Sequence, residues 1–400
     1  MFFKYCTLSK AKNYIRDKVI KILPVSSKYR NKLLVDKHLK SLRCKGEKIS
    51  IRNNINITRS NGLVLGNNVA FHNGISIDAT AGVLIGDRST IGDNVRISTV
   101  EIINDRLEYN PIVIGPDQEV KSDLNLGAII HNNIFNKGLV KYSGQIVFVL
   151  STGRSGSKAI AQLLNSHPDS ECYHDTFPHI YKWSCDLLYG NSEKEEIKRF
   201  LLSLYSSIDV KAKLVHGQSD QKLAPLVPIL KTMFPSAKFI WLIRRPESFI
   251  SSSYPRGWFD NSEFGFSPNS NEYFQKEVTP SKFDAAHRTN GYLAGNMTED
   301  QWKEMTAFER NCWYWNYWNN YIESQLSLMN KSKWMKVELE SLKENANSIF
   351  EFLGLSSSEA IFEKVNTATY NKVTRDKWTK EMNVLFDRHC KENASRWYND

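Results

Sequence analysis

The pattern of apolar and polar positions divides the chain into three parts. Residues 1–44 repeat their apolar positions roughly at helical spacing on either side of Pro24, which predicts two helical stretches. Residues 45–120 place apolar residues at every sixth position. In residues 143–400, unbroken apolar runs alternate with stretches of helical spacing, which is typical of a parallel sheet flanked by helices. We expect residues 121–142 to be a linker.

The middle part repeats itself with a period of 20 residues. Residues 61–80 align with residues 81–100, and residues 41–60 fall in the same register. The matched apolar pairs are Leu65 with Ile85, Phe71 with Ile91, and Ile77 with Ile97. A six-residue period with Gly or a polar residue after the apolar one predicts short strands joined by tight turns and stacked as a solenoid. A further coil is expected to begin at Ile114, after a loop over residues 104–110.

Composition narrows the class of protein. The chain is 41% hydrophobic and 24% charged, as in ordinary globular proteins. It has no run of 18 apolar residues, so no membrane-spanning helix is predicted. The N-terminus lacks the apolar region and cleavage site of a signal peptide. The six cysteines show no metal-ligand spacing, and we expect reduced thiols in a cytoplasmic protein.

Positive charge is concentrated near the N-terminus. Residues 1–50 contain 14 Lys and Arg against 3 Asp and Glu, a net charge of +11, whereas the remaining 350 residues carry −1. Such a stretch suits nucleic acid or an anionic membrane surface. A solvated pair of basic helices explains it equally well. We expect no nucleic-acid partner, and we expect residues 1–44 to contact the inner membrane face peripherally.

A phosphate-binding loop is predicted after the apolar run at residues 146–150. The run has the composition of a buried parallel strand, and the sequence STGRSGS follows it at residues 151–157. The glycines allow the backbone to turn tightly and approach an anion, toward which amides at the next helix N-terminus point. The candidate binding residues are Gly153, Arg154, Ser155, Gly156, Ser157 and Lys158.

The loop does not have the spacing of a Walker A motif. Two residues separate its glycines where that motif has four, and Ser157 precedes Lys158 where that motif has Lys before Ser or Thr. The site therefore suits an anion better than a metal-bound nucleotide, and we expect no metal.

A second anion site is predicted after the apolar run at residues 239–243. This run ends at Arg244, and Ser252 follows eight residues on, about two turns along the next helix. An Arg fork and a hydroxyl on one side suit a phosphate. A possible strand at residues 213–216 lies between the two runs. Two anion sites at the carboxyl ends of parallel strands imply a ligand with phosphates at both ends.

These motifs carry a resemblance to sulfotransferases. The family's 5′-phosphosulfate loop, in the RSGS form of carbohydrate sulfotransferases, resembles residues 146–169 (IVFVLSTGRSGSKAIAQLLNSHPD). Its 3′-phosphate motif resembles residues 235–253 (PSAKFIWLIRRPESFISSS), with Arg and Ser eight positions apart. A late strand and helix of the family resemble residues 334–355 (WMKVELESLKENANSIFEFLGL).

The resemblance implies a sulfotransferase fold and PAPS (3′-phosphoadenosine 5′-phosphosulfate) as the sulfuryl donor. The loop residues would hold the phosphosulfate, and Arg244 and Ser252 would hold the 3′-phosphate, with Arg245 as their neighbour. Arg154 would stabilise the charge that grows on the bridging oxygen as the sulfuryl group leaves. The segment NKVTRDKWTKEM resembles the family's C-terminal basic element, which implies that Lys372, Arg375 and Trp378 close over the donor.

The resemblance also implies a base that takes the proton of the acceptor hydroxyl. Asp175 stands where carbohydrate-type members keep Glu, so it is the leading candidate. His174 and His216 follow, because imidazole titrates closest to neutral pH. Glu171 and His179 are further possibilities. The aromatic cluster at residues 313–318 has helical spacing and is expected to pack in the core.

Residues 45–120 resemble the hexapeptide-repeat left-handed β-helix family, which includes many acyltransferases. Members commonly trimerise, so assembly into a homotrimer is expected of this part. His72 is the single histidine in the repeat and is expected to be a surface turn residue.

The sequence thus predicts an α/β sulfotransferase with a P-loop-like parallel sheet, preceded by a left-handed parallel β-helix. We expect it to transfer a sulfuryl group from PAPS to a hydroxyl of a surface polysaccharide or lipid-linked glycan, leaving PAP (3′-phosphoadenosine 5′-phosphate). One alternative is a bifunctional enzyme in which His72 also serves acyl transfer. The other is a non-catalytic assembly protein that binds an adenine nucleotide.

Overall fold

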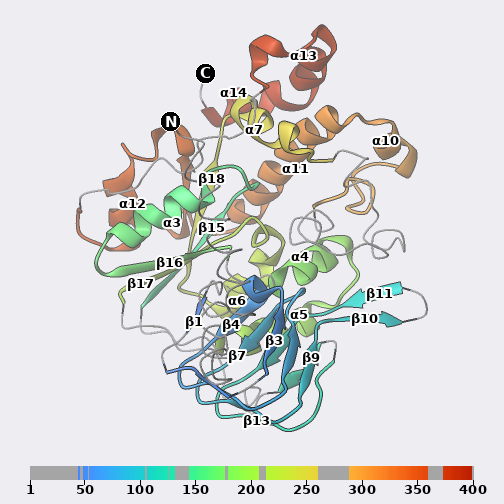
Figure 1. Ribbon diagram of the computed structural model, residues 1–400. Coiled ribbons are helices and arrows are strands. Elements are labelled where there is room, and N and C mark those ends of the chain that lie inside the picture. Colours follow the sequence, from blue (N-terminus) through green and yellow to red (C-terminus); the bar gives the residue numbers. More distant parts are fainter. Residues whose placement is uncertain are drawn as a thin grey trace, which may run out of the picture.

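The computed structural model of the chain is shown in Figure 1. It describes residues 44–45, 48–52, 54–103, 106–125, 127–130, 144–175, 179–206, 213–259, 288–358 and 373–398. The basic segment predicted over residues 1–44 lies outside the described residues, apart from Cys44. None of the described helices is both long enough and apolar enough to cross a membrane.

The C-terminal part is built on a five-stranded parallel sheet with the order β16–β17–β15–β18–β19. The strands are β15 (Gln145–Leu150), β16 (Ser170–His174), β17 (Val215–Ser219), β18 (Lys238–Ile243) and β19 (Trp334–Glu338). Strands β15 and β18 confirm the two apolar runs predicted as strands. Since all five strands run in one direction, their carboxyl ends meet at a single edge of the sheet.

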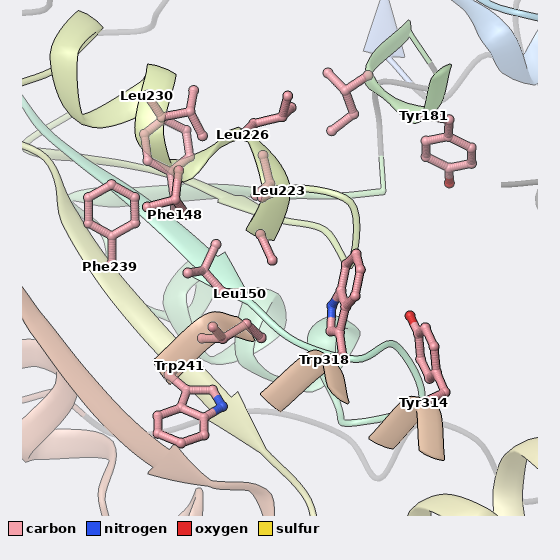
Figure 2. Close-up of a cluster of buried hydrophobic side chains, with 14 of the residues drawn as sticks. Phe148, Leu150, Tyr181, Leu223, Leu226, Leu230, Phe239, Trp241, Tyr314 and Trp318 are labelled. Atoms are coloured by element: carbon pink, nitrogen blue, oxygen red, sulfur yellow. The ribbon is translucent and has the colours of Figure 1, made fainter. Parts of the chain in front are cut away.

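Alternate residues of the central strands face two helical layers. Val147 and Val149 pack with residues of α3 (Ser157–Ser166) and α12 (Ala346–Leu353). Phe148 and Leu150 face the opposite layer, where Figure 2 shows them in one apolar cluster with Leu223 and other residues. Both faces of the sheet are covered, which explains why β15 and β18 read as continuous apolar runs.

The layer on the Phe148 face contains most of the remaining helices. Its cluster includes residues of α4 (His179–Tyr189), α5 (Lys194–Ser206), α6 (Val227–Met233), α7 (Pro246–Ser253), α10 (Glu299–Glu304), α11 (Ala307–Ser327), α13 (Lys380–Phe386) and α14 (Glu392–Tyr398).

The described residues from 44 to 130 form a repeat unit of short parallel strands in three sheets. One sheet has the order β1–β4–β7–β12–β14, another β2–β5–β8–β13, and the third β3–β6–β9. The strands are β1 (Cys44–Lys45), β2 (Ser50–Ile51), β3 (Asn56–Thr58), β4 (Leu63–Leu65), β5 (Ala70–Phe71), β6 (Ser76–Asp78), β7 (Val83–Ile85), β8 (Thr90–Ile91), β9 (Arg96–Ser98), β12 (Ile112–Ile114), β13 (Glu119–Val120) and β14 (Ile129–Ile130).

The register of the repeat unit follows the 20-residue period. Leu65 pairs with Ile85, Phe71 with Ile91, and Ile77 with Ile97, and each of these six residues is at most 3% exposed. All six belong to one interior apolar cluster. Equivalent aliphatic and aromatic residues of successive repeats therefore stack on one another, which a single repeat could not achieve.

The repeat unit differs from its prediction in two places. The loop expected over residues 104–110 includes β11 (Arg106–Tyr109), which pairs antiparallel with β10 (Val100–Ile103) just before it, and the Val, Ile, Leu and Tyr residues of these strands favour pairing. Pairing also continues past residue 120, because β14 pairs with β12. The linker expected over residues 121–142 therefore begins later, and residues 131–142 lie outside the described residues.

One face of the repeat unit is buried against the C-terminal part. Val64, Leu84 and Val113 are the middle residues of β4, β7 and β12 and are at most 4% exposed. Their flanking residues point to the opposite side, into the interior of the repeat unit. These three residues instead share an apolar cluster with Phe200 and Leu204 of α5. The repeat unit and the C-terminal part thus share a core.

Truncation of Leu84 should therefore destabilise the C-terminal part. Leu84→Ala removes buried methyl groups from the shared cluster, so we expect the free energy of unfolding to fall by about 2–5 kcal/mol. All ten tryptophans lie within residues 183–397, so tryptophan fluorescence in a denaturant titration reports on the C-terminal part. Thr90→Ala, on another sheet of the repeat unit, is the matched control. A wild-type fluorescence transition for Leu84→Ala would contradict the shared core.

His216 lies at the amino-terminal edge of the sheet. It pairs with Ile146 near the start of β15 and is 8% exposed. Burial lowers the pKa of this imidazole below its usual value of 6.5, against the smaller opposing effects of a backbone hydrogen bond at Lys213 and the charge of Glu171. The folded protein therefore favours the neutral imidazole more than the unfolded chain does.

This lowered pKa should make the protein less stable in acid. The unfolded chain binds a proton at His216 near pH 6.5, whereas the folded protein binds it only at lower pH. The stability that the neutral imidazole contributes is present above pH 6.5 and is lost as the pH falls toward the folded pKa. The fall in Tm between about pH 7 and pH 5 should be smaller in His216→Gln than in wild type. An identical fall in both proteins would contradict this account.

Candidate functional site

The loop between β15 and α3 turns sharply at its glycines. Gly153 and Gly156 have φ angles of 74° and 90°, which glycine adopts without strain, and Arg154 between them has a φ of 51°. Gly156 is also the N-cap of α3 and offers no side chain to the first amides, and the first turn carries no acidic residue. This ten-residue helix therefore directs uncapped N–H groups and the positive end of its dipole toward the loop.

Hydroxyl groups hold the loop from within. Thr152 Oγ1 donates to the carbonyl oxygen of Gly153 (2.9 Å) and lies 2.6 Å from Ser155 Oγ, which bonds to the same carbonyl (3.1 Å). Ser155 is 1% exposed, so its side chain supports the loop and its backbone amide is what it can offer to an anion. Lys158 is exposed on the first turn of α3.

The structure brings the two predicted anion sites together. Arg154 Nε donates to Ser252 Oγ at 3.1 Å, across 98 residues of sequence. Arg244 Nη1 donates to the carbonyl oxygen of Arg154 at 2.8 Å, across 90 residues. We call Arg154, Arg244 and Ser252 the arginine cluster. It joins the carboxyl ends of the neighbouring strands β15 and β18.

Helix α11 fixes the backbone on which the arginine cluster stands. Tyr314 Oη donates to the carbonyl oxygen of Thr152 (3.1 Å), and Trp318 Nε1 to that of Ser151 (2.9 Å). Trp315 Nε1 donates to the carbonyl oxygen of Arg244 (2.9 Å). The three aromatic side chains are at most 1% exposed, which confirms the predicted core packing. Figure 2 shows Tyr314 and Trp318 in the same cluster as Leu150.

Two of the candidate bases lie at the same edge of the sheet. His174 ends β16, and its Nδ1 lies 3.2 Å from the carbonyl oxygen of Ser219 at the end of β17. Asp175 follows, with a φ of 48°, and its N–H donates to the same carbonyl oxygen (3.1 Å). Tyr181 on α4 donates its hydroxyl proton to Asp175 Oδ1. Asp175 is thus a carboxylate held by a hydrogen bond at the carboxyl edge.

The structure contradicts His216 as a base. The strand expected over residues 213–216 would have ended at His216, but β17 runs over Val215–Ser219 and places His216 near its start. His216 and its pairing partner Glu171 therefore lie toward the opposite edge from the loop. The side chain of His179, the first residue of α4, lies outside the described parts.

Sequence reasoning missed residues that follow β17. Lys222 is 2% exposed, and its Nζ lies 5.8 Å from the ring centre of Tyr181. Gln221 approaches the loop so closely that a Cβ on Gly153 would collide with its side-chain oxygen. The sequence did contain a signal for Lys222, because this lysine stands between a strand and the apolar run of residues 223–230. Such a position indicates burial, and a buried lysine usually has a partner group.

The three C-terminal residues predicted to close over the donor have different outcomes. Arg375 pairs with Glu247 Oε1 (3.1 Å) on the first turn of α7 and with Asp387 Oδ1 (3.4 Å), so it lies near the helix that carries Ser252. Trp378 is 7% exposed, packs edge-on against Phe308, and donates from Nε1 to a nearby carbonyl. The prediction that Trp378 closes over the donor is wrong, because its ring is part of the core. Lys372 lies outside the described residues.

The repeat unit holds the remaining candidate. His72 Nδ1 lies 3.8 Å from Asp93 Oδ2, and the two side chains are 28% and 52% exposed. Hydrogen bonds from Asn73 lower the pKa of Asp93 below its usual range. Among the described residues, no group of three or more His, Cys, Asp and Glu side chains is arranged to hold a metal ion.

Comparison of the chain with known proteins identifies the family to which it belongs. The family described as "Sulfotransferase domain" matches residues 145–399, more than half of the chain. No curated protein sequence matches the chain.

Solved structures of low sequence identity also match the chain. A sulfotransferase from Alicyclobacillus acidocaldarius matches with 11% identity and a TM-score of 0.38, covering 65% of this chain and 98% of its own. A mouse sulfotransferase complexed with PAP matches with 14% identity and a TM-score of 0.33, covering 64% and 88%. A third, from Mycobacterium tuberculosis, has 12% identity and a TM-score of 0.30, covering 61% and 76%. With TM-scores below 0.5, these likenesses carry none of the argument.

The match over residues 145–399 includes the loop after β15, the strand before Arg244, and the helix that carries Ser252. The chain belongs to the sulfotransferase family, and it is a sulfotransferase enzyme.

Proposed function

We propose that this enzyme transfers the sulfuryl group of PAPS to a hydroxyl of a carbohydrate. The observation that carries the proposal is the arginine cluster, in which Arg154 of the first anion site bonds to Ser252 of the second. PAPS bears a phosphosulfate at one end and a 3′-phosphate at the other, so its donor site needs two anion-binding groups at a fixed separation.

The residues present fit this donor. The uncapped amides of α3 and the Arg154 guanidinium suit the phosphosulfate, because charged donors and helix N-termini both favour anions. Arg244 and Ser252 suit the 3′-phosphate. Arg375 stands beside α7 through its ion pair with Glu247 and adds positive charge to that end. No metal ion is needed to balance the charge, and we propose that none takes part.

PAPS supplies an activated sulfuryl group whose bond to the bridging phosphate oxygen breaks on transfer. Asp175 would accept the proton of the attacking acceptor hydroxyl, and its hydrogen bond from Tyr181 fixes the orientation of the carboxylate. Arg154 would stabilise the negative charge that develops on the bridging oxygen. Lys222, which follows β17, and the N-terminus of α3, which follows β15, both lie at the carboxyl edge of the sheet, and they would keep positive charge around the sulfuryl oxygens.

The carbohydrate acceptor is supported by two features of the sequence. The loop has the RSGS form that resembles carbohydrate sulfotransferases, and the repeat unit is of a kind more usual on carbohydrate-modifying enzymes. We propose a surface polysaccharide or lipid-linked glycan as the acceptor. Acyl transfer at His72, next to Asp93, is the alternative additional activity.

We further propose that the repeat unit is a hexapeptide-repeat left-handed β-helix that assembles the enzyme as a homotrimer. Its 20-residue register and interior stacking support the first part of this proposal. The charge of residues 1–50 supports a cytoplasmic enzyme held at the inner membrane face.

Calorimetric titration with PAP tests the donor site. Wild-type protein should bind PAP, and Arg244→Ala should bind it about 10- to 100-fold more weakly, because a hydrogen bond to a charged group is lost. Arg388→Ala is the control, since Arg388 is an exposed arginine paired with Glu309. A folded wild-type protein that does not bind PAP would refute the proposed function. Equal affinity in wild type and Arg244→Ala would refute the assignment of Arg244.

Asp175→Asn tests the base. The amide keeps the size of the side chain but cannot take a proton, so kcat should fall by about 10²- to 10⁴-fold with little change in PAP affinity. The assay is transfer of labelled sulfate from PAPS to a panel of p-nitrophenyl glycosides. Asp186→Asn on α4, where the carboxylate pairs with Lys182, is the matched control. If Asp175→Asn retains wild-type kcat, the base is another residue, and His174 is the nearest candidate.

A further inference from the structure

The C-terminal helix α14 packs against the strand end that carries Arg244. Trp397 is 3% exposed, and its ring contacts two tryptophans edge-on, Trp241 of β18 at 5.4 Å and Trp315 of α11 at 5.3 Å between ring centres. Trp315 in turn donates its indole N–H to the carbonyl oxygen of Arg244. Trp397 therefore holds the indole of Trp315 in place, and this indole in turn holds the backbone of Arg244.

The next residue supports the second arginine of the motif. The Arg245 guanidinium lies over the ring of Tyr398, 4.7 Å from the ring centre, and Tyr398 is 7% exposed. The N–H of Arg245 donates to Glu340 Oε1 at 3.0 Å. Both the backbone and the side chain of Arg245 are thus held, at the N-cap of α7.

Tyr398 contacts Arg245 through its aromatic ring and not through its hydroxyl. Burial, together with the charges of Glu340 and Glu338, raises the pKa of Tyr398 far above its usual value, so the phenol stays protonated. Within the described residues its hydroxyl has no hydrogen-bond partner. Lys336 anchors this end of α14 by donating to the carbonyl oxygen of Trp397, and Lys336 also pairs with Glu338 at 3.3 Å.

We propose that Trp397 and Tyr398 are positioning residues for the 3′-phosphate of the donor. They hold Arg244 and Arg245 in the geometry that recognises this phosphate, while the loop that receives the phosphosulfate stands on other contacts, from Tyr314 and Trp318. This inference rests on the proposed function, because it presupposes that the donor carries a 3′-phosphate. It assigns a role in the site to the last described turn of the chain.

The test compares PAP with 5′-AMP, which lacks the 3′-phosphate, by calorimetry on the full chain. Tyr398→Leu should bind PAP about 3- to 30-fold more weakly, the size of a partly buried cation–π contact, and should bind 5′-AMP as wild type does. Tyr398→Phe keeps the ring and should retain wild-type affinity for both nucleotides. Phe352→Leu is the matched control, since it removes a ring that faces Lys238 at the other end of β18.

Each outcome separates the possible causes. If Tyr398 has only a general structural role, Tyr398→Leu should reduce the affinity for PAP and for 5′-AMP equally. That result would overturn the inference, and so would an unchanged affinity for both nucleotides. If Tyr398→Leu does not fold, Arg245→Gln tests the same contact from the other side and should reduce PAP affinity selectively. Wild-type protein that binds PAP no better than 5′-AMP would contradict the 3′-phosphate site itself. Selective PAP loss in Tyr398→Leu and Arg245→Gln, with both nucleotides unaffected in Phe352→Leu, would support the inference.

Discussion

The arginine cluster is the interaction on which the rest of the site depends. Arg154 comes from the loop after β15, and Arg244 and Ser252 come from the strand and helix that begin some 90 residues later. The parallel pairing of β15 with β18 brings these groups to one edge of the sheet. Both arginines carry a positive charge, so an anionic group that binds at this edge is favoured. The fold thus concentrates positive charge where the proposed donor carries negative charge.

Aromatic residues hold this charge in place. The buried helix α11 bonds to the carbonyl oxygens of Ser151, Thr152 and Arg244, so the backbone of both anion sites is fixed by one rigid element. The same helix is also packed by Trp397 of α14 and by Cys390, which lies between α13 and α14. The site therefore depends on a large aromatic core, to which Trp241, Trp315 and Trp397 belong.

Local patterns in the sequence predicted the parts of the fold that follow from periodicity. The runs at residues 146–150 and 239–243 are strands, and the 20-residue period matches the observed register. The sequence placed an anion site at the end of each run, but it did not predict the hydrogen bonds that join the two sites. The prediction of His216 as a base failed because it depended on the exact limits of a strand. Strand β17 begins two residues later than expected, which moves His216 from the site to the opposite edge of the sheet. Trp378 and Lys222 depend on tertiary packing, because a tryptophan in a basic segment and a lysine beside an apolar run give no sign of which neighbours will enclose them.

The most direct test of the account is a crystal structure of the protein soaked with PAP. The account predicts the 5′-phosphate on the backbone amides of residues 153–157 and the 3′-phosphate between Arg244 and Ser252, with the hydrogen bond from Arg154 to Ser252 replaced by or shared with the ligand. Asp175 should lie on the open side of the 5′-phosphate, where an acceptor hydroxyl would stand. PAP bound elsewhere on the molecule, or with its 3′-phosphate away from Arg244, would contradict the central claim that the two strand ends form one donor site.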